Sequence, residues 1–60
     1  MPGWSPFSTG DRVRVLNGAF AGREGEVKAI IEEFDKVRLE IIIFGRPVPV
    51  ELDYWQVEEA

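Results

Sequence analysis

Hydrophobic and polar residues alternate most clearly in two segments of the chain, and in both the alternation predicts a β-strand. Residues 12–15 read Arg-Val-Arg-Val. In residues 36–44 one face carries Val37, Leu39, Ile41 and Ile43, and the other carries Arg38, Glu40, Ile42 and Phe44. Because successive side chains of a strand point to opposite sides, the charged residues mark the second face as the solvent face. We therefore expect Ile42 and Phe44 to be exposed.

Three further strands follow from shorter signals. Residues 25–31 should form a strand after a glycine-rich loop around Phe20, with a turn in residues 32–36 behind it. Residues 46–52 should form another, and because Pro47 and Pro49 both lack an N–H it should lie at an edge of the sheet. A tight turn at Asp53 and a last strand at residues 56–58 complete the set. The sequence predicts an all-β fold, a small five-stranded barrel.

A helical interpretation of residues 26–41 competes with this prediction. Apolar residues also recur there at the spacing of an amphipathic helix, namely Val27, Ile30, Ile31, Phe34, Val37 and Ile41. Glu32 precedes Lys36 by four residues, the spacing of a helix-surface ion pair. We favour strands because β-branched residues are abundant and because the flanking glycine-rich turn and proline-bearing strand need a sheet to join.

Length and composition allow only one small domain. A 60-residue chain buries only about 60% of the surface that it exposes when unfolded, so its stability will be marginal. Hydrophobic residues make up 45% of the chain, which is enough to expect folding. Residues 1–9 have the composition of a linker or a disordered tail, and residues 10–60 should form the domain. Within the tail, Phe7 is better placed than Trp4 to fold back onto the domain.

Charge and missing residue types narrow the function. The net charge of −4 weighs against nucleic acid as the main partner, because affinity for nucleic acid rests mainly on neutralising phosphates. The chain has neither cysteine nor histidine, so we expect no metal, no cofactor and no catalysis. It also lacks a membrane-spanning run and a signal peptide, which favours a cytoplasmic location, and we expect a monomer.

The strongest candidate for function is an exposed apolar surface. Ile42 and Phe44 beside Arg46 form an apolar anchor with a polar rim, as in protein-binding sites. Arg46 could pair with a carboxylate of a partner, or with Glu51 or Asp53 of its own chain. Phe20 could extend the surface, or it could plug one end of the core.

Two other groups of residues have weaker functional interpretations. A basic strip could bind RNA, comprising Arg12, Arg14, Arg23 and Lys28, but the interleaved Glu24, Glu26 and Glu32 favour ordinary solvated strand faces. Tyr54 and Trp55, with Trp4, could form an aromatic cage for a methylated lysine. For Tyr54 a place in the core is the better expectation.

Four motifs carry a resemblance to a known family. They are "GDRVRV" at residues 10–15, "NGAFAG" at 17–22, "IFGRPVPVELD" at 43–53 and "QVEEA" at 56–60. The chain resembles a KOW module, and more narrowly the C-terminal domain of NusG-type bacterial transcription factors. The resemblance implies a five-stranded SH3-like β-barrel behind a separate N-terminal domain that binds RNA polymerase. Met1 would then be an introduced start.

The resemblance also implies partners and a site. In the family this module binds ribosomal protein NusE or the termination factor Rho, and so acts in coupling to translation, antitermination or termination. Carried over to this sequence, the partner-binding residues are Phe20, Ile42, Ile43, Phe44, Gly45 and Arg46. Phe44 would be the main anchor, and Ile43 would face inward and hold the strand.

Three positions differ from the family pattern, which implies a partner surface that differs in part from the usual one. Arg23 stands where an aromatic residue is usual, Gly22 where an acidic residue is common, and Trp55 where a small polar residue is expected. A specialised relative similar to RfaH is an alternative, because the RfaH C-terminal domain switches between an α-helical hairpin and the barrel. The remaining alternative is an RNA-binding KOW module like those of ribosomal proteins.

Overall fold

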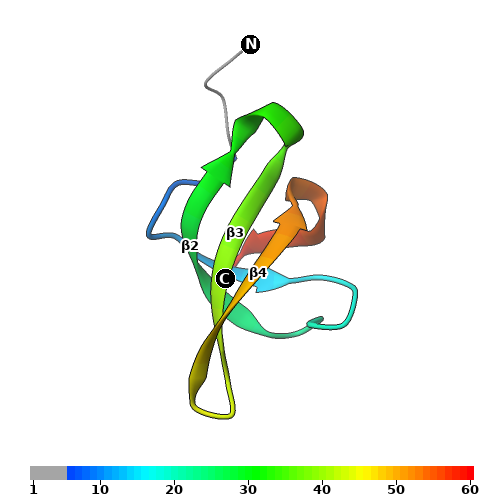
Figure 1. The fold of residues 1–60 in the computed structure, drawn as a ribbon. Helices are drawn as coiled ribbons and strands as arrows, with labels where there is room; N and C mark the ends of the chain where they lie inside the picture. The colour runs from blue at the N-terminus through cyan, green and yellow to red at the C-terminus, as the bar shows by residue number, and fades with distance from the viewer. Residues whose placement is uncertain (1–5) are drawn as a thin grey trace.

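The computed structural model of the chain describes residues 6–60; residues 1–5, with Trp4, Met1 and half of the predicted tail, lie outside the described residues. Five antiparallel strands form one sheet with the order β4-β3-β2-β1-β5. The strands are β1 (Arg12–Val15), β2 (Glu24–Ile31), β3 (Lys36–Ile43), β4 (Arg46–Asp53) and β5 (Val57–Glu59). Two 3-10 turns, η1 (Glu32–Phe34) and η2 (Tyr54–Gln56), follow β2 and β4. The sheet curls around its core into a small barrel (Figure 1).

The predicted all-β fold is confirmed, and the helical interpretation of residues 26–41 is wrong for this structure, since that segment forms β2, η1 and most of β3. Two boundaries need correction. The third strand ends at Ile43, because Phe44 lies in the turn. The last strand begins at Val57, because Gln56 belongs to η2, where its side-chain Oε1 accepts the Asp53 N–H at 3.0 Å.

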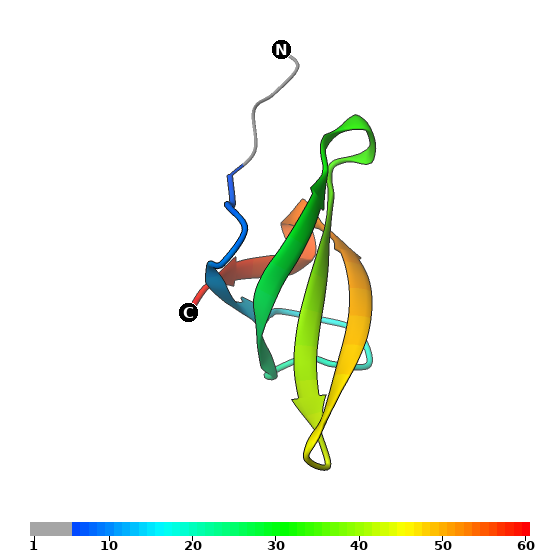
Figure 2. The ribbon, with the colours of Figure 1, turned by 60° about the vertical axis from the view of Figure 1, so that its left-hand side comes forward.

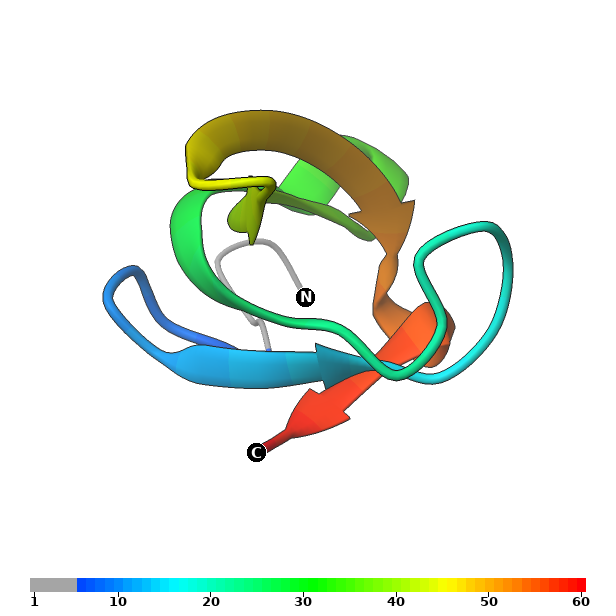
Figure 3. The ribbon, with the colours of Figure 1, turned by 90° about the horizontal axis from the view of Figure 1, so that it is seen from below.

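The core is built from one face of each strand. Its buried residues are Phe7, Val13, Val15, Val27, Val37, Leu39, Ile41 and Val57. Half-buried residues pack against it, namely Phe20, Ile30, Ile43, Val50, Leu52 and Tyr54. The predicted inward face of β3 is therefore confirmed. Figure 3 looks along the barrel and shows the strands curving around this interior.

Phe7 belongs to this core although it precedes residue 10. Its ring meets that of Tyr54 edge to face, with the centroids 6.0 Å apart. The expectation that Phe7 folds back onto the domain is confirmed. The division of the chain at residue 10 stays a prediction.

A bulge and a glycine let β2 follow the curved sheet. Val27 pairs with Leu39 and Ala29 pairs with Arg38, so Lys28 is an extra residue on β2. Before the bulge the inward-facing residue is the odd-numbered Val27, and after it the even-numbered Ile30. Simple alternation along the strand does not predict this shift. At Gly25 a Cβ would lie 2.7 Å from the Glu40 carbonyl oxygen, so only glycine allows this close approach of β2 to β3.

The β4 strand is a sheet edge, as its prolines predict. At one end Ile43 and Arg46 flank a two-residue turn, and at the other the Tyr54 N–H donates to the Asp35 carbonyl at 2.9 Å. Both observations indicate that the N–H groups of the even-numbered residues of β4 point toward β3. Pro47 and Pro49 therefore occupy positions whose N–H would face the open edge. Their missing N–H groups protect that edge from pairing with another strand.

Candidate partner-binding site

The candidate site is the tip of the hairpin formed by β3 and β4, which extends beyond the rest of the barrel (Figure 2). Phe44 and Gly45 are the two turn residues, and their φ angles are 52° and 76°. Positive φ at both central residues defines a type I′ turn, which favours Asn, Asp and Gly. For a bulky residue such as Phe44 the left-handed region is unfavourable, at a cost of about 1 kcal/mol. We define the hairpin tip by the residues Ile42, Ile43, Phe44, Gly45, Arg46 and Pro47.

The hairpin tip presents an apolar surface to solvent. The Phe44 side chain is 96% exposed, and Ile42 on the solvent face of β3 is 57% exposed, so the prediction of exposure is confirmed for both. Pro47 lies directly opposite Ile42 in the ladder and is also exposed. Since residues directly opposite share a face, Pro47 extends the apolar surface of Ile42. The Phe44 ring gains almost nothing from the fold to offset the cost of its conformation.

Ile43 and Arg46 lie on the other face of the hairpin, opposite each other. Ile43 is half-buried and packs against the core, as expected, and so fixes the direction of the hairpin. Arg46 is exposed and forms no ion pair with any residue in 6–60. Its two intramolecular candidates have other partners: Glu51 pairs with Arg38 at 3.4 Å, and Asp53 with Lys36 at 3.8 Å. The Arg46 guanidinium is therefore available to a carboxylate from outside the chain.

Phe20 lies apart from the hairpin tip. It sits in the loop between β1 and β2, where it is half-buried and packs against the core. Figures 1 and 3 show that this loop and the hairpin tip project from different sides of the barrel. Of the two roles considered for Phe20, the structure supports packing against the core. Its part in partner binding stays a prediction.

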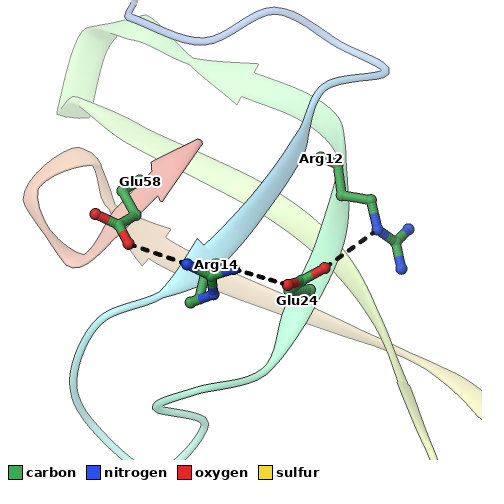
Figure 4. A network of polar contacts seen from close by, with 4 residues as sticks. All are labelled: Arg12, Arg14, Glu24 and Glu58. Atoms are coloured by element: carbon green, nitrogen blue, oxygen red, sulfur yellow. Dashed lines mark hydrogen bonds and ion pairs between the residues drawn. The ribbon is translucent and has the colours of Figure 1, made fainter. Parts of the chain in front are cut away.

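Three of the four residues of the basic strip form ion pairs on the outer faces of β1 and β2, and Arg23 forms none with a residue that the structure describes. Arg14 pairs with Glu24 at 3.0 Å and with Glu58 at 3.4 Å, and Arg12 reaches the same Glu24 at 3.5 Å (Figure 4). The hydrogen bond to Glu24, then the charge of that carboxylate, raise the pKa of Arg14 above its usual range. Lys28 pairs in the same way with Glu26 and Glu40. These contacts favour the ordinary interpretation, solvated strand faces.

The aromatic cage for a methylated lysine is not assembled by the residues that the structure describes. Tyr54 packs against the core and contacts Phe7, as was expected of it, whereas Trp55 is exposed. Among the described residues no cluster of three or more His, Cys, Asp or Glu could hold a metal ion. Nor does any helix in that part of the chain have the length and hydrophobicity to cross a membrane.

Sequence reasoning missed the turn conformation of Phe44. The signal was present, because two residues ending in glycine stand between two strand-like segments, and that pattern predicts a type I′ hairpin. It was hidden by Phe44 itself, since a large apolar residue reads more easily as the end of a strand than as a turn residue.

The comparisons with known proteins agree with this fold. The family model described as "KOW motif" matches residues 9–40, more than half of the chain. A solved structure described as "Domain interaction in Thermotoga maritima NusG" superposes with a TM-score of 0.85 at 34% identity, over 93% of this chain and 32% of that one. The MjSpt4:Spt5 complex superposes with a TM-score of 0.81 at 24% identity, which shows the fold alone. The class is thus the small all-β SH3-like KOW domain.

Curated relatives narrow the class further. The chain is 51% identical over 53 residues to the transcription termination/antitermination protein NusG of Liberibacter asiaticus, covering 88% of this chain and 76% of that protein. It is 48% identical to NusG of Treponema pallidum and 50% identical to NusG of Thermus thermophilus, over 87% and 90% of this chain. It spans only 28% and 29% of those two proteins. The chain belongs to the NusG family of KOW-containing transcription factors.

Proposed function

We propose that this domain recruits a partner protein to transcribing RNA polymerase through its hairpin tip, and that the partner is ribosomal protein NusE, the termination factor Rho, or each of them in turn. The observation that carries the proposal is Phe44. Its ring is 96% exposed in a turn conformation that disfavours it, so stability does not account for its presence. A role in binding does account for it, since exposed aromatic anchors dominate the energy of protein interfaces.

Each residue of the tip has a distinct part in this proposal. Phe44 inserts into an apolar pocket of the partner, while Ile42 and Pro47 widen the contact beside it. Arg46 pairs with a carboxylate of the partner, and Gly45 allows the turn that projects Phe44. Ile43 anchors the hairpin to the core, and Phe20 contributes at the margin of the interface.

The whole protein supplies the link to transcription in this proposal. The chain spans less than a third of the T. pallidum and T. thermophilus relatives, so a separate N-terminal domain would bind RNA polymerase. The names of these relatives include termination and antitermination, which suits a domain that exchanges partners. The domain would act in the cytoplasm as a monomer and would catalyse no reaction.

Two alternatives have less support. An RNA-binding module needs several uncompensated basic residues, but within the basic strip Arg12, Arg14 and Lys28 are paired with glutamates, which leaves Arg23 alone without an ion pair to a described residue. Tight RNA binding with a steep salt dependence would favour it nonetheless. An RfaH-like switch predicts helix in residues 26–41 when the domain packs on its own N-terminal domain, which far-UV circular dichroism of the isolated and full-length proteins would test.

The decisive experiment compares Phe44→Ala with Phe34→Ala. Both rings are exposed, but Phe34 lies at the other end of the barrel, so it is a matched control. In NMR titrations with NusE and with Rho, Phe44→Ala should weaken binding about 30-fold, the effect of losing an interface anchor. Phe34→Ala should bind as the unchanged chain does. If Phe44→Ala remains folded and binds both partners with unchanged affinity, the proposal is wrong.

A further inference from the structure

A second group of exposed hydrophobic residues lies away from the hairpin tip. Besides Ile42 and Phe44, the large exposed side chains are those of Leu16, Phe34 and Trp55. These three come from segments that meet at η2. The Tyr54 N–H donates to the Asp35 carbonyl at 2.9 Å, and the Leu16 N–H donates to the Gln56 carbonyl at 2.7 Å. Phe34 and Trp55 therefore flank one backbone contact between their segments, whereas Leu16 lies beside Gln56, at the other end of η2.

Phe34 belongs to the end of the barrel opposite the hairpin tip. Figures 1 and 2 both show η1 at that end, the turn of the β3–β4 hairpin at the other, and η2 in the same half of the barrel as η1. Phe34 and Trp55 are each 68% exposed, so neither ring is needed to fill the core. We call Phe34 and Trp55, with the neighbouring carboxylates of residues 32–35, the η2 surface.

Uncompensated negative charge lies in the same turn as Phe34. Glu32 and Glu33 belong to η1, and Asp35 follows it. All three are exposed, and none forms an ion pair within the part of the chain that the structure describes. The nearest cation in sequence, Lys36, already pairs with Asp53. The η2 surface thus combines two aromatic rings and three free carboxylates.

We propose that the η2 surface is a second binding site, one that takes a lysine- or arginine-rich segment of a partner protein. Charge complementarity identifies the occupant. Carboxylates attract the cations, and the faces of Trp55 and Phe34 bind both the cationic groups and the apolar stems that carry them. The same negative charge repels nucleic acid and anionic lipid surfaces. This site is independent of the hairpin tip, so both could be occupied at once.

A synthetic peptide of alternating lysine and leucine serves as the probe, with a matched peptide in which glutamate replaces lysine. Added to the isotope-labelled chain, the lysine peptide should shift the NMR signals of residues 32–35 and 54–56 and of the Trp55 indole N–H. It should leave Phe44 and Gly45 unmoved, and the glutamate peptide should not shift the signals of residues 32–35 and 54–56 or of the Trp55 indole N–H. Equal shifts with both peptides, or shifts centred on the hairpin tip, would overturn the proposal.

Variants separate the contributions of the rings and of the charge. The double variant Phe34→Ser, Trp55→Ser should lower the affinity for the lysine peptide at least about tenfold, because the apolar contact with the peptide is lost. The double variant Glu32→Gln, Glu33→Gln should lower the affinity for the lysine peptide about threefold at low salt and less at high salt. Phe44→Ser is the control and should bind as the unchanged chain does. Unchanged affinity in either double variant contradicts the proposal, and the charge variant suffices if the ring variant fails to fold.

A second copy of the chain is the rival occupant. The spectrum of the chain without peptide, recorded over a range of concentrations, distinguishes the two. Signals of residues 32–35 and 54–56 should not move with concentration. Concentration-dependent shifts at those residues would assign the surface to self-association and refute the basic partner.

Discussion

The hairpin tip and the η2 surface lie in opposite halves of one small barrel (Figures 1 and 2), and they differ in charge. At the tip, Phe44 and Ile42 are exposed, and Arg46, on the other face of the hairpin from Ile42, is a cation with no ion pair within residues 6–60. At the η2 surface the exposed rings of Phe34 and Trp55 stand beside free carboxylates. The comparison indicates that the two ends suit partners of opposite charge.

Each end also contains a feature that lowers the stability of the fold. At the tip it is the left-handed conformation of Phe44, which lies on the proposed binding surface itself. Near the η2 surface the destabilising feature is the buried hydroxyl of Tyr54, the first residue of η2, which has no hydrogen-bond partner within the described part of the chain. Only the first cost is borne by a residue that a partner would contact. Substitutions at the two ends should therefore separate binding from stability in different ways.

The largest effect is expected at Gly45, where the turn depends on a φ of 76°. Gly45→Val should lower the free energy of unfolding by about 2 kcal/mol, because a β-branched residue is strongly disfavoured in that region. It should also abolish partner binding by displacing Phe44. Gly45→Asn is the matched control and should stay within about 0.5 kcal/mol, since Asn tolerates left-handed φ. Urea unfolding curves measure both, and equal losses in the two variants would refute the turn argument.

A smaller effect of opposite sign is expected at Phe44. Phe44→Asn should raise the free energy of unfolding by about 1 kcal/mol, because Asn suits a type I′ turn and no buried contact is lost. The same variant should no longer bind NusE or Rho. A gain in stability together with a loss of binding would identify Phe44 as a residue retained for function. A loss of stability in urea unfolding would mean that the ring contributes to the fold.

The sequence predicts the fold and the exposed pair because both depend on local periodicity. The alternation of β3 places Ile41 inside and Ile42 outside, and the prolines of β4 mark an edge whatever the rest of the chain does. The bulge at Lys28 was not predictable in this way, because it depends on how β2 bends around a core formed by distant residues. Alternation across β2 fails for the same reason.

The η2 surface could not have been predicted from periodicity. Phe34 and Trp55 are distant in sequence, and the hydrogen bond from the Tyr54 N–H to the Asp35 carbonyl brings their segments together. The ion pairs of Arg14 are a partial exception, since the interleaving of arginine and glutamate indicated neutralisation without naming Glu58 as a partner. Exposure of single aromatics is thus a tertiary property, whereas exposure along a regular strand is a local one.

The smallest effect is expected beneath the η2 surface, at Tyr54. Its ring packs against Phe7 and its hydroxyl is buried without a partner among residues 6–60, so Tyr54→Phe removes a desolvated polar group and keeps the aromatic contact. The free energy of unfolding should rise by about 0.5 kcal/mol. Unlike Phe44→Asn, this variant should retain every binding activity, because Tyr54 belongs to the core rather than to either surface. Urea unfolding and the lysine-peptide titration check both parts: a destabilised variant would show that the hydroxyl has a partner in the folded chain, and weakened peptide binding would place Tyr54 within the η2 surface.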